Sequence, residues 1–358
     1  MQRSITIERY KGMKRLEIPN LAPFTLIGGK NDIGKSSFLE AMFVFFDRQN
    51  PGALLSHLGW RNVGTLDATP DNVWEPVFYN HDTSTPIIIT MVDDRNVTRD
   101  VRYRLVKNHV AQQTFAPFSF SAGDKPILQT QAPGQTALGV MAKQGNTTLQ
   151  DTYVSIGIGG ITSSGRVQSA ETHQAVYLTA GRNIDAAAPG RLTNVVSAKK
   201  KDVLVEIARL IDDRIVDLSV GASLAGNSFV LATVEGQRPI PLALLGGGAS
   251  IVINMALAIL ATPNGTILID ELETGIHHSA LRHVIGALSK AARESNVQII
   301  ATTHSYECIK AAFDVFSNEP NDRFAYLRLE RSKEGDVAAK VYTKEALAFA
   351  MNSEWEVR

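Results

Sequence analysis

Hydrophobic and polar residues alternate along the first part of the chain. Residues 4–8 (SITIE) follow the period of two that is typical of a strand with one buried face, and residues 14–18 (KRLEI) and 24–29 (FTLIGG) predict two further strands. Residues 35–47 (KSSFLEAMFVFFD) follow the pattern of a helix, and residues 86–92 (PIIITMV) that of another strand. A helix that follows an apolar strand and a glycine-rich turn indicates an α/β lobe.

The pattern changes between residues 94 and 172, where Thr, Gln, Gly and Ser are frequent. Short alternating runs such as VRYRLV and TYVSIGI occur within this stretch. Such runs between polar turns predict antiparallel strands, so we interpret the stretch as a β-rich or loop-rich insertion.

Longer apolar runs return after residue 172. Residues 175–182 (AVYLTAGR) predict a buried strand, residues 199–213 (KKKDVLVEIARLIDD) an amphipathic helix, and residues 215–220 and 228–236 two strands. A glycine turn and helix (244–260), a strand (265–273), a helix (278–294) and a strand (297–305) then follow in this order. Continuous apolar strands that alternate with helices are typical of parallel sheets, so we expect an α/β fold.

The chain therefore divides into an N-terminal lobe (1–93), the insertion (94–172) and a C-terminal lobe (173–358). Its net formal charge is zero, with 36 basic and 36 acidic residues, so the overall charge does not indicate DNA or a membrane as partner. Lys199–Lys201 is the only basic run, and a solvated helix face explains it. DNA binding by a local patch stays open.

The location of the protein is predicted from two absences in the sequence. The first residues carry charges and lack the apolar core of a signal peptide, and the longest apolar stretch, 251–261, contains Asn254 and is too short to cross a bilayer. The single cysteine, Cys308, excludes a disulfide within the chain. We expect a cytoplasmic protein without a membrane partner.

Residues Gly29–Ser36 (GKNDIGKS) fit the phosphate-loop pattern G-x-x-x-x-G-K-S and lie between an apolar strand and a helix. The backbone N–H groups of such a turn surround phosphate oxygens. Lys35 would contact the β- and γ-phosphates of ATP, and Ser36 would bind Mg²⁺. The alternative is a glycine-rich turn that binds nothing.

A second candidate for the nucleotide site is the strand TILID. Asp270 lies at the carboxyl end of this strand, where ligands bind in open α/β sheets. Asp270 can hold Mg²⁺ through its water shell, and Glu271 can activate a water molecule for attack on the γ-phosphate. A strand that ends in Asp-Glu is often only an exposed turn, but a phosphate loop in the same chain favours the functional interpretation.

A second glycine-rich turn, LLGGGAS (Leu244–Ser250), also opens a helix. It lacks a lysine, so it offers half of a site, and a symmetric pair of chains could close each Lys35 site with the partner's turn. A close-packing turn is the alternative. The strand IIATTHS ends near His304, and a single histidine at a strand end is more often structural than catalytic. We nevertheless favour a functional role, because we expect this strand to neighbour the Asp270 strand and to bring the imidazole near the γ-phosphate.

The adjacent residues His277 and His278 could suggest a metal site, but no further histidine or carboxylate has the spacing of a metal ligand. We therefore interpret them as part of a turn that contacts the partner chain.

These motifs resemble the ABC-type ATPase heads of the RecF, Rad50 and SMC group, and more narrowly the OLD-like AAA ATPases of bacterial anti-phage defence. The similarity covers residues 4 to about 316 except the insertion. It implies an α/β fold, the ABC-type P-loop ATPase head with a mixed or parallel sheet core and a β-rich insertion. It also implies site residues: the phosphate loop with Gly29, Asn31, Gly34, Lys35, Ser36 and Ser37; Lys11 near the nucleotide; Asp270 on Mg²⁺; Glu271 as base; His304 as γ-phosphate sensor; and Gly246, Gly247 and Gly248 in a signature turn that acts on a second copy.

The chain departs from this group in three places. Gly246 replaces the signature serine, and the glutamine lid is not evident, with Asn80 or His81 in residues 74–82 as candidates. OLD proteins often carry a C-terminal TOPRIM nuclease, whereas only 54 residues follow His304 here. A nuclease or toxin would then be a separate polypeptide.

The resemblance thus implies an ATP- and Mg²⁺-dependent ATPase, a homodimer or higher oligomer, that controls a separate effector such as a TOPRIM-type nuclease in phage defence. Two alternatives remain open at this stage. One is a RecF-like DNA-repair ATPase, and the other is a nucleotide-binding scaffold that sequesters a toxin with negligible turnover.

Overall fold

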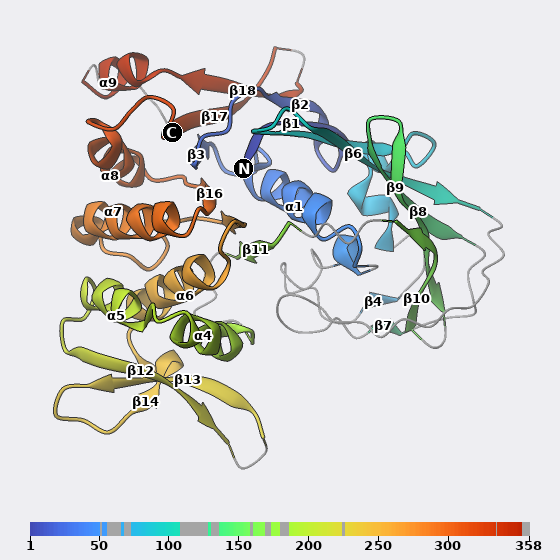
Figure 1. Ribbon diagram of the computed structural model, residues 1–358. Coiled ribbons are helices and arrows are strands. Elements are labelled where there is room, and N and C mark those ends of the chain that lie inside the picture. The colour runs from blue at the N-terminus through green and yellow to red at the C-terminus, as the bar shows by residue number, and fades with distance from the viewer. Residues whose placement is uncertain are drawn as a thin grey trace.

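The core of the molecule is a six-stranded sheet (Figure 1). The computed structural model describes residues 1–50, 52–55, 66–67, 73–107, 128–129, 136–157, 160–168, 173–179, 186–223, 226–333 and 335–352. The strand order in the core sheet is β11 (Ala175–Leu178), β15 (Thr266–Ile269), β16 (Gln298–Thr302), β3 (Phe24–Gly29), β17 (Phe324–Arg331) and β18 (Val337–Tyr342). The first five are parallel to their neighbours and β18 is antiparallel to β17. The sheet is therefore mixed, with a parallel centre.

Helices cover both faces of the centre of this sheet, which explains why β15, β16 and β3 are buried at every position. Ile267 and Ile269 of β15 belong to the hydrophobic cluster on the side of α6 (Gly247–Ala261), α7 (His278–Glu294) and α8 (Tyr306–Phe316). Leu268 between them points to the opposite cluster, which contains α1 (Lys35–Phe46). Because successive side chains of a strand alternate, burial of both faces requires an apolar residue at each position.

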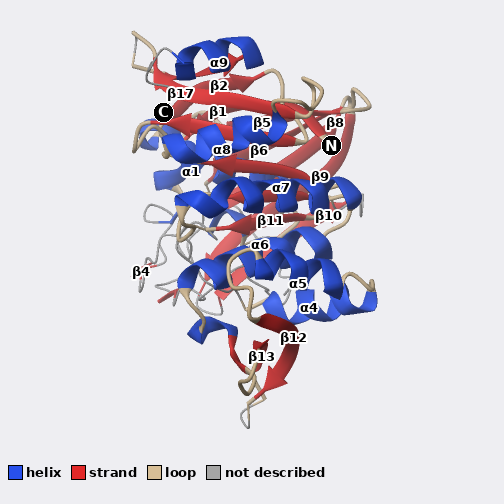
Figure 2. Ribbon diagram, turned by 90° about the vertical axis from the view of Figure 1, so that its left-hand side faces the viewer, coloured by secondary structure: helices blue, strands red, loops and turns tan. Residues whose placement is uncertain are grey.

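A second, seven-stranded antiparallel sheet packs on the α1 side (Figures 1 and 2). Its order is β10 (Gly160–Val167), β9 (Thr147–Gly157), β8 (Ala137–Gln144), β6 (Thr98–Val106), β5 (Ile87–Asp93), β1 (Gln2–Tyr10) and β2 (Met13–Ile18). Helix α1 thus lies between two sheets, and its residues Phe38–Phe46 are all buried. Strands from the N-terminal lobe and from residues 94–172 share this one sheet.

The remaining elements are smaller. Helices α4 (Ala188–Ser197) and α5 (Lys201–Arg209) pack on α6, and beyond them lies a three-stranded antiparallel sheet of β12 (Ile215–Ala222), β13 (Ser228–Val234) and β14 (Ile240–Pro241). The other elements are β4 (Leu66–Asp67) paired with β7 (Leu128–Gln129), helix α9 (Lys344–Asn352), and the 3-10 helices Ala53–Leu55, Glu75–Val77, Tyr79–His81 and Leu242–Leu244. Among the described residues, no helix is long and apolar enough to cross a membrane.

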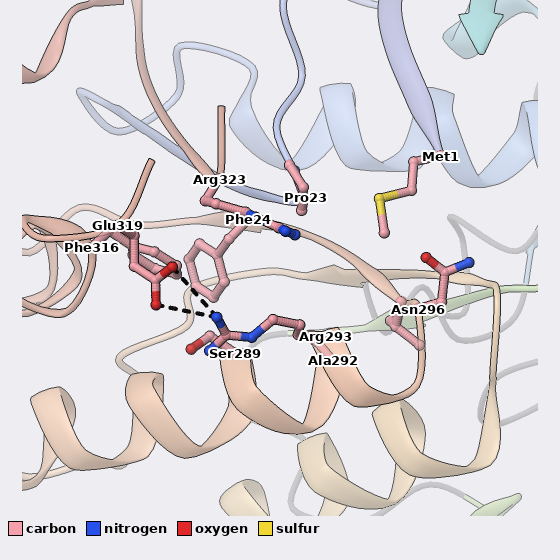
Figure 3. A pocket seen from close by; sticks show the side chains of 11 residues that line it. Met1, Pro23, Phe24, Ser289, Ala292, Arg293, Asn296, Phe316, Glu319 and Arg323 are labelled. Carbon is pink, nitrogen blue, oxygen red and sulfur yellow. Dashed lines mark hydrogen bonds and ion pairs between the residues drawn. The ribbon is translucent and has the colours of Figure 1, made fainter. Parts of the chain in front are cut away.

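Aromatic packing joins α8 to the core sheet. The rings of Phe316 and Phe324 are stacked with centroids 4.9 Å apart, and Phe24 lies 5.0 Å from Phe316. Phe24 and Phe316 border a cavity of about 70 Å³, at whose rim Arg293 pairs with Glu319 (Figure 3). The cavity is small, so it is a feature of packing between α7, α8 and β3.

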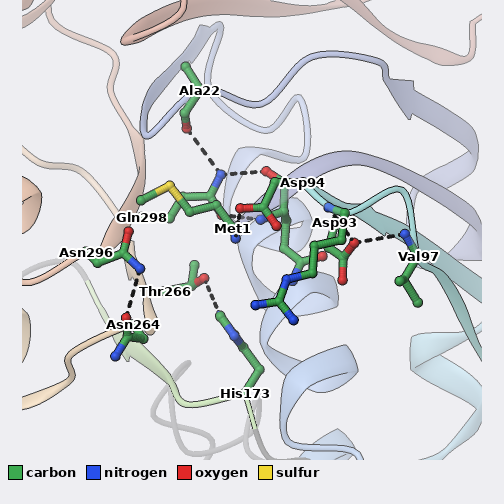
Figure 4. Close-up of polar contacts among 12 residues, drawn as sticks. Met1, Ala22, Asp93, Asp94, Val97, His173, Asn264, Thr266, Asn296 and Gln298 are labelled. Carbon is green, nitrogen blue, oxygen red and sulfur yellow. Dashed lines mark hydrogen bonds and ion pairs between the residues drawn. The ribbon is translucent and has the colours of Figure 1, made fainter.

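Polar pairs close the amino ends of the core strands (Figure 4). The N-terminal ammonium of Met1 is 3.0 Å from Asp94 Oδ2, and His173 Nε2 is 2.8 Å from Thr266 Oγ1. The Gln298 amide accepts from Gln2 N and donates to the Gln2 carbonyl. The opposite, carboxyl edge is where ligands bind in open α/β sheets.

Candidate active site

The phosphate-loop sequence forms a turn between β3 and α1. Gly29 has φ +137°, and a Cβ there would lie 2.6 Å from the Leu329 carbonyl oxygen, so only glycine fits. Gly34, with φ +104°, immediately precedes α1 in a left-handed conformation. Asn31 is exposed, and Ser36 and Ser37 in the first turn of α1 are half-buried. The predicted strand–turn–helix context is present.

Lys35, the first residue of α1, is directed back over this turn. Its ammonium donates to the carbonyl oxygens of Gly29 at 2.7 Å and Lys30 at 2.9 Å. Burial lowers the pKa of Lys35, and the negative charges of Asp270, Glu271 and Glu273 oppose that shift. The residue is only 9% exposed, so a bound phosphate would meet a weakly hydrated cation here.

Asp270 follows β15 and is held by two hydroxyl groups. Thr302 Oγ1 donates to Asp270 Oδ1 at 2.6 Å, and Tyr177 Oη donates to Asp270 Oδ2 at 3.3 Å. The two donors come from the strands on either side of β15, namely β16 and β11. A fixed carboxylate and the Ser36 hydroxyl are oxygen ligands of the kind that Mg²⁺ prefers, so these residues fit that metal.

Glu271 has an unusual backbone conformation. Its φ is +53°, in the left-handed region that costs a residue with a Cβ about 1 kcal/mol. Its N–H donates to Thr302 Oγ1 at 2.9 Å, and Thr274 Oγ1 donates to Glu271 Oε2 at 3.1 Å. The side chain remains 40% exposed. A strained residue with an accessible carboxylate is typical of a functional site.

His304 reaches the same edge from the loop after β16. The expected neighbourhood is confirmed, because β16 pairs with β15 and lies between it and β3. His304 Nδ1 is 3.1 Å from Glu273 Oε1 and 3.8 Å from Glu271 Oε1, and its side chain is 47% exposed. Lys35, Asp270, Glu271 and His304 thus come from three adjacent strand ends.

The second glycine turn also forms as predicted, with Gly246 immediately before α6. Cβ atoms at Gly246 or Gly247 would have no neighbour within 4 Å, whereas one at Gly248 would lie 2.5 Å from the Gly275 carbonyl oxygen. Close packing therefore explains Gly248 but not the two glycines before it. Leu244, just before the turn, is 74% exposed.

The positions of the remaining candidates are also defined. Lys11, in the β1–β2 turn with φ +49°, pairs its ammonium with the carboxylate of Glu40 in α1, which is 2% exposed. Asn80 and His81 lie in the exposed 3-10 helix Tyr79–His81, both with positive φ. A role of any of the three at the nucleotide stays a prediction.

Two matches to protein families accompany this geometry. Residues 1–132 match the family described as "AAA ATPase domain", and residues 168–309 match the family described as "AAA domain, putative AbiEii toxin, Type IV TA system". The first match contains the phosphate loop, and the second contains Asp270, Glu271 and His304. The chain is a P-loop ATPase. The α/β fold with a mixed sheet core that the sequence predicts is present in the structure.

Similar proteins are found across most of the chain. This ATPase is 23% identical over 345 residues to a Helicobacter pylori protein named "ATP/GTP phosphatase", with 87% of each chain covered. It is also 34% identical over 85 residues to the uncharacterised protein MJECL11 of Methanocaldococcus jannaschii. This aligned segment covers 24% of this chain and 75% of that protein.

Solved structures with a similar arrangement include SMC heads. The SMC head domain from Thermotoga maritima has a TM-score of 0.43 at 12% identity, with 95% of this chain and 98% of that chain covered. An Smc head bound to the C-winged helix domain of ScpA has a TM-score of 0.49 at 11% identity, with 96% and 98% covered.

The structure adds three residues that sequence reasoning did not assign to the nucleotide site. Tyr177 and Thr302 orient Asp270, and Glu273 contacts His304. Tyr177 precedes Asp270 by 93 residues, so only the strand order brings the two together. Thr302, two residues before His304, could have been considered from its position at the end of the same apolar run.

Proposed function

We propose that this ATPase is an Mg²⁺-dependent sensor or scaffold that controls a separate nuclease or toxin in defence against phage. The proposal of a defence role rests on the resemblance to OLD-like ATPases and on the match to a family described with a toxin of a type IV TA system. The name of the Helicobacter pylori relative, "ATP/GTP phosphatase", supports nucleotide hydrolysis as the underlying reaction.

The observation that carries the proposed chemistry is the convergence of one lysine, three carboxylates and one imidazole on a single sheet edge. In this proposal Lys35 binds the β- and γ-phosphates, and His304 contacts the γ-phosphate. Ser36 and Asp270 would hold Mg²⁺, which supplies charge neutralisation to the phosphates when bound. Glu271, exposed at the mouth of the site, accepts a proton from the attacking water.

The second glycine turn supports a composite site between two copies. Gly246 and Gly247 leave open space where side chains would be, at the start of the fifteen-residue helix α6. Backbone N–H groups at such a start attract phosphate oxygens. The exposed Leu244 beside the turn would be covered by a second copy. We therefore propose a homodimer or higher oligomer, in which the turn Leu245–Ser250 completes the partner's Lys35 site.

Mixing two inactive variants tests the composite site. Gly247→Arg should leave nucleotide binding by the isolated chain intact, because open space surrounds Gly247 within its own chain. The arginine side chain should, however, prevent this turn from approaching the phosphates bound in the partner's site. When this variant is mixed with Lys35→Ala chains, a mixed dimer has one composite site with both substitutions and one site with neither. Part of the ATPase activity should therefore return. Absence of recovery at every ratio, with subunit exchange shown by fluorescence transfer, would contradict the arrangement.

Affinity capture tests the effector. The Glu271→Gln variant should accumulate with ATP bound and retain a specific protein from cells that carry the neighbouring genes, whereas Lys35→Ala should not retain it. Equal capture by both variants would contradict nucleotide-dependent control. Retention of duplex DNA in place of a protein would instead favour the DNA-repair function.

A further inference from the structure

Glu273 is the most buried carboxylate in contact with His304. Its side chain is 10% exposed, against 40% for Glu271 and 47% for His304. One oxygen, Oε1, accepts from the His304 backbone N–H at 2.9 Å and lies 3.1 Å from His304 Nδ1. The carboxylate therefore holds both the main chain and the ring of the same residue.

This contact assigns the proton on the imidazole. An ionised carboxylate only accepts hydrogen bonds, so the ring nitrogen that faces it carries the proton. Nδ1 is the ring nitrogen nearest to Glu273, 3.1 Å from Oε1, so a proton on Nδ1 leaves Nε2 free to contact a ligand. A carboxylate that fixes the tautomer of a histidine in this way is a general device in catalytic and metal sites.

The other carboxylate oxygen of Glu273 faces the protein interior. Glu273 Oε2 is buried and accepts no N–H or O–H hydrogen bond from the described part of the chain. The Cys308 thiol in the first turn of α8 is beside this carboxylate, and burial, followed by the negative charge of Glu273, raises the pKa of Cys308 far above its usual range. The thiol is thus neutral beside the carboxylate that contacts His304.

We propose that Glu273 is a positioning residue that fixes His304 as the Nδ1–H tautomer and directs its Nε2 toward the γ-phosphate. The tautomer follows from the contacts above, whereas the effect on turnover rests on the proposed role of His304. Glu273 comes from the loop after β15 and His304 from the loop after β16. The pair therefore also fixes the two strand ends to each other.

Nitrogen-15 spectra of histidine-labelled protein test the tautomer without reference to activity. The His304 signals are identified by their loss in His304→Gln. Wild type should show Nδ1 protonated and Nε2 unprotonated once the ring is neutral. Glu273→Ala should shift His304 toward the Nε2–H form, and Glu273→Gln, which keeps an acceptor oxygen, should retain the wild-type pattern. An Nε2–H tautomer in wild type, or no change in Glu273→Ala, would overturn the proposal.

Kinetics then separate positioning from a structural effect. Glu273→Ala should lower kcat roughly 10- to 100-fold, the range found for residues that orient metal or catalytic ligands, with little change in KM. In a His304→Gln background the same change should cost nothing more, because its effect passes through the imidazole. A further loss there would show a structural role and overturn the assignment.

Glu307→Gln is the matched charge control, since Glu307 accepts from Ser305 Oγ and not from His304. In this variant the His304 tautomer and kcat should be the same as in the wild type. If His304→Gln itself leaves kcat unchanged, the sensor role in the proposed function fails while the tautomer assignment stands.

Discussion

The two edges of the core sheet are both polar, but they differ in how their polar groups are satisfied. At the amino edge the side chains pair within the chain: Gln298 is 0% exposed and makes hydrogen bonds to Gln2 and Ala22, and Asn296 donates to Asn264 at 2.8 Å (Figure 4). At the carboxyl edge Glu271 and His304 remain 40% and 47% exposed. Closed pairs stabilise a fold, whereas accessible charges leave room for a ligand.

Backbone conformation shows the same difference. Asn264 and Asn296 at the amino edge have φ values of +61° and +52°, which asparagine adopts at little cost. Glu271 at the carboxyl edge has φ +53°, where a glutamate is strained. The sequence thus suits the local conformation at the amino edge and opposes it at the carboxyl edge, which is the pattern expected when chemistry and not stability selects the residue.

The largest effect is expected for Lys35→Ala. The variant removes the cation that three carboxylates face and two or more charged hydrogen bonds to phosphate, each of about 1.5–3 kcal/mol. ATP affinity should fall at least about 100-fold. Calorimetric titration measures this, with the exposed Lys310 on α8 changed to Ala as control. Undiminished affinity would show that the turn does not bind phosphate.

Glu271→Gln should give the next largest effect. Gln keeps the size of the side chain but cannot accept the proton, so kcat should fall roughly 10²- to 10⁴-fold while ATP affinity stays close to wild type. Single-turnover hydrolysis measures the chemical step. An unchanged rate would remove Glu271 from the reaction.

A change at the amino edge should affect stability and not turnover. Gln298→Ala leaves the buried Gln2 N–H without its acceptor, and the free energy of unfolding should drop by about 2–3 kcal/mol. Urea unfolding measures the loss, and kcat under native conditions should match wild type. A large loss of kcat in the folded variant would show that the two edges are not independent.

The comparison also explains what could be predicted from the sequence. The phosphate loop, the Asp-Glu strand end and the Gly246–Gly248 turn are local patterns, in which neighbouring residues dictate the conformation, and the structure forms all three turns where they were expected. The parallel core was predictable because its strands are apolar on both faces.

Contacts between distant segments were not predictable in this way. Tyr177 meets Asp270 only because β11 neighbours β15, a pairing that no local pattern indicates. The pairing of β16 with β15 was expected, but the contact of Glu273 with His304 across it was not. Likewise, nothing local indicates that strands from residues 98–167 continue the sheet of β1 and β5, since β-pairing depends on long-range packing.

The smallest predicted effect concerns acid stability at the amino edge. Burial, followed by the nearby N-terminal ammonium and Arg99, lowers the pKa of His173 from 6.5 to about 4. Between these values the unfolded chain binds more protons than the folded one, so stability should rise with pH across this window and be lost as the pH falls from 6.5 toward 4. The loss should be about 1–3 kcal/mol. His173→Gln keeps a polar partner for Thr266 and removes the titration, so its unfolding free energy should vary less over this range than that of wild type. Parallel pH dependences of urea unfolding in the two proteins would assign the acid sensitivity to other groups, and ATP affinity at neutral pH should be the same in both, because His173 lies at the edge opposite Lys35.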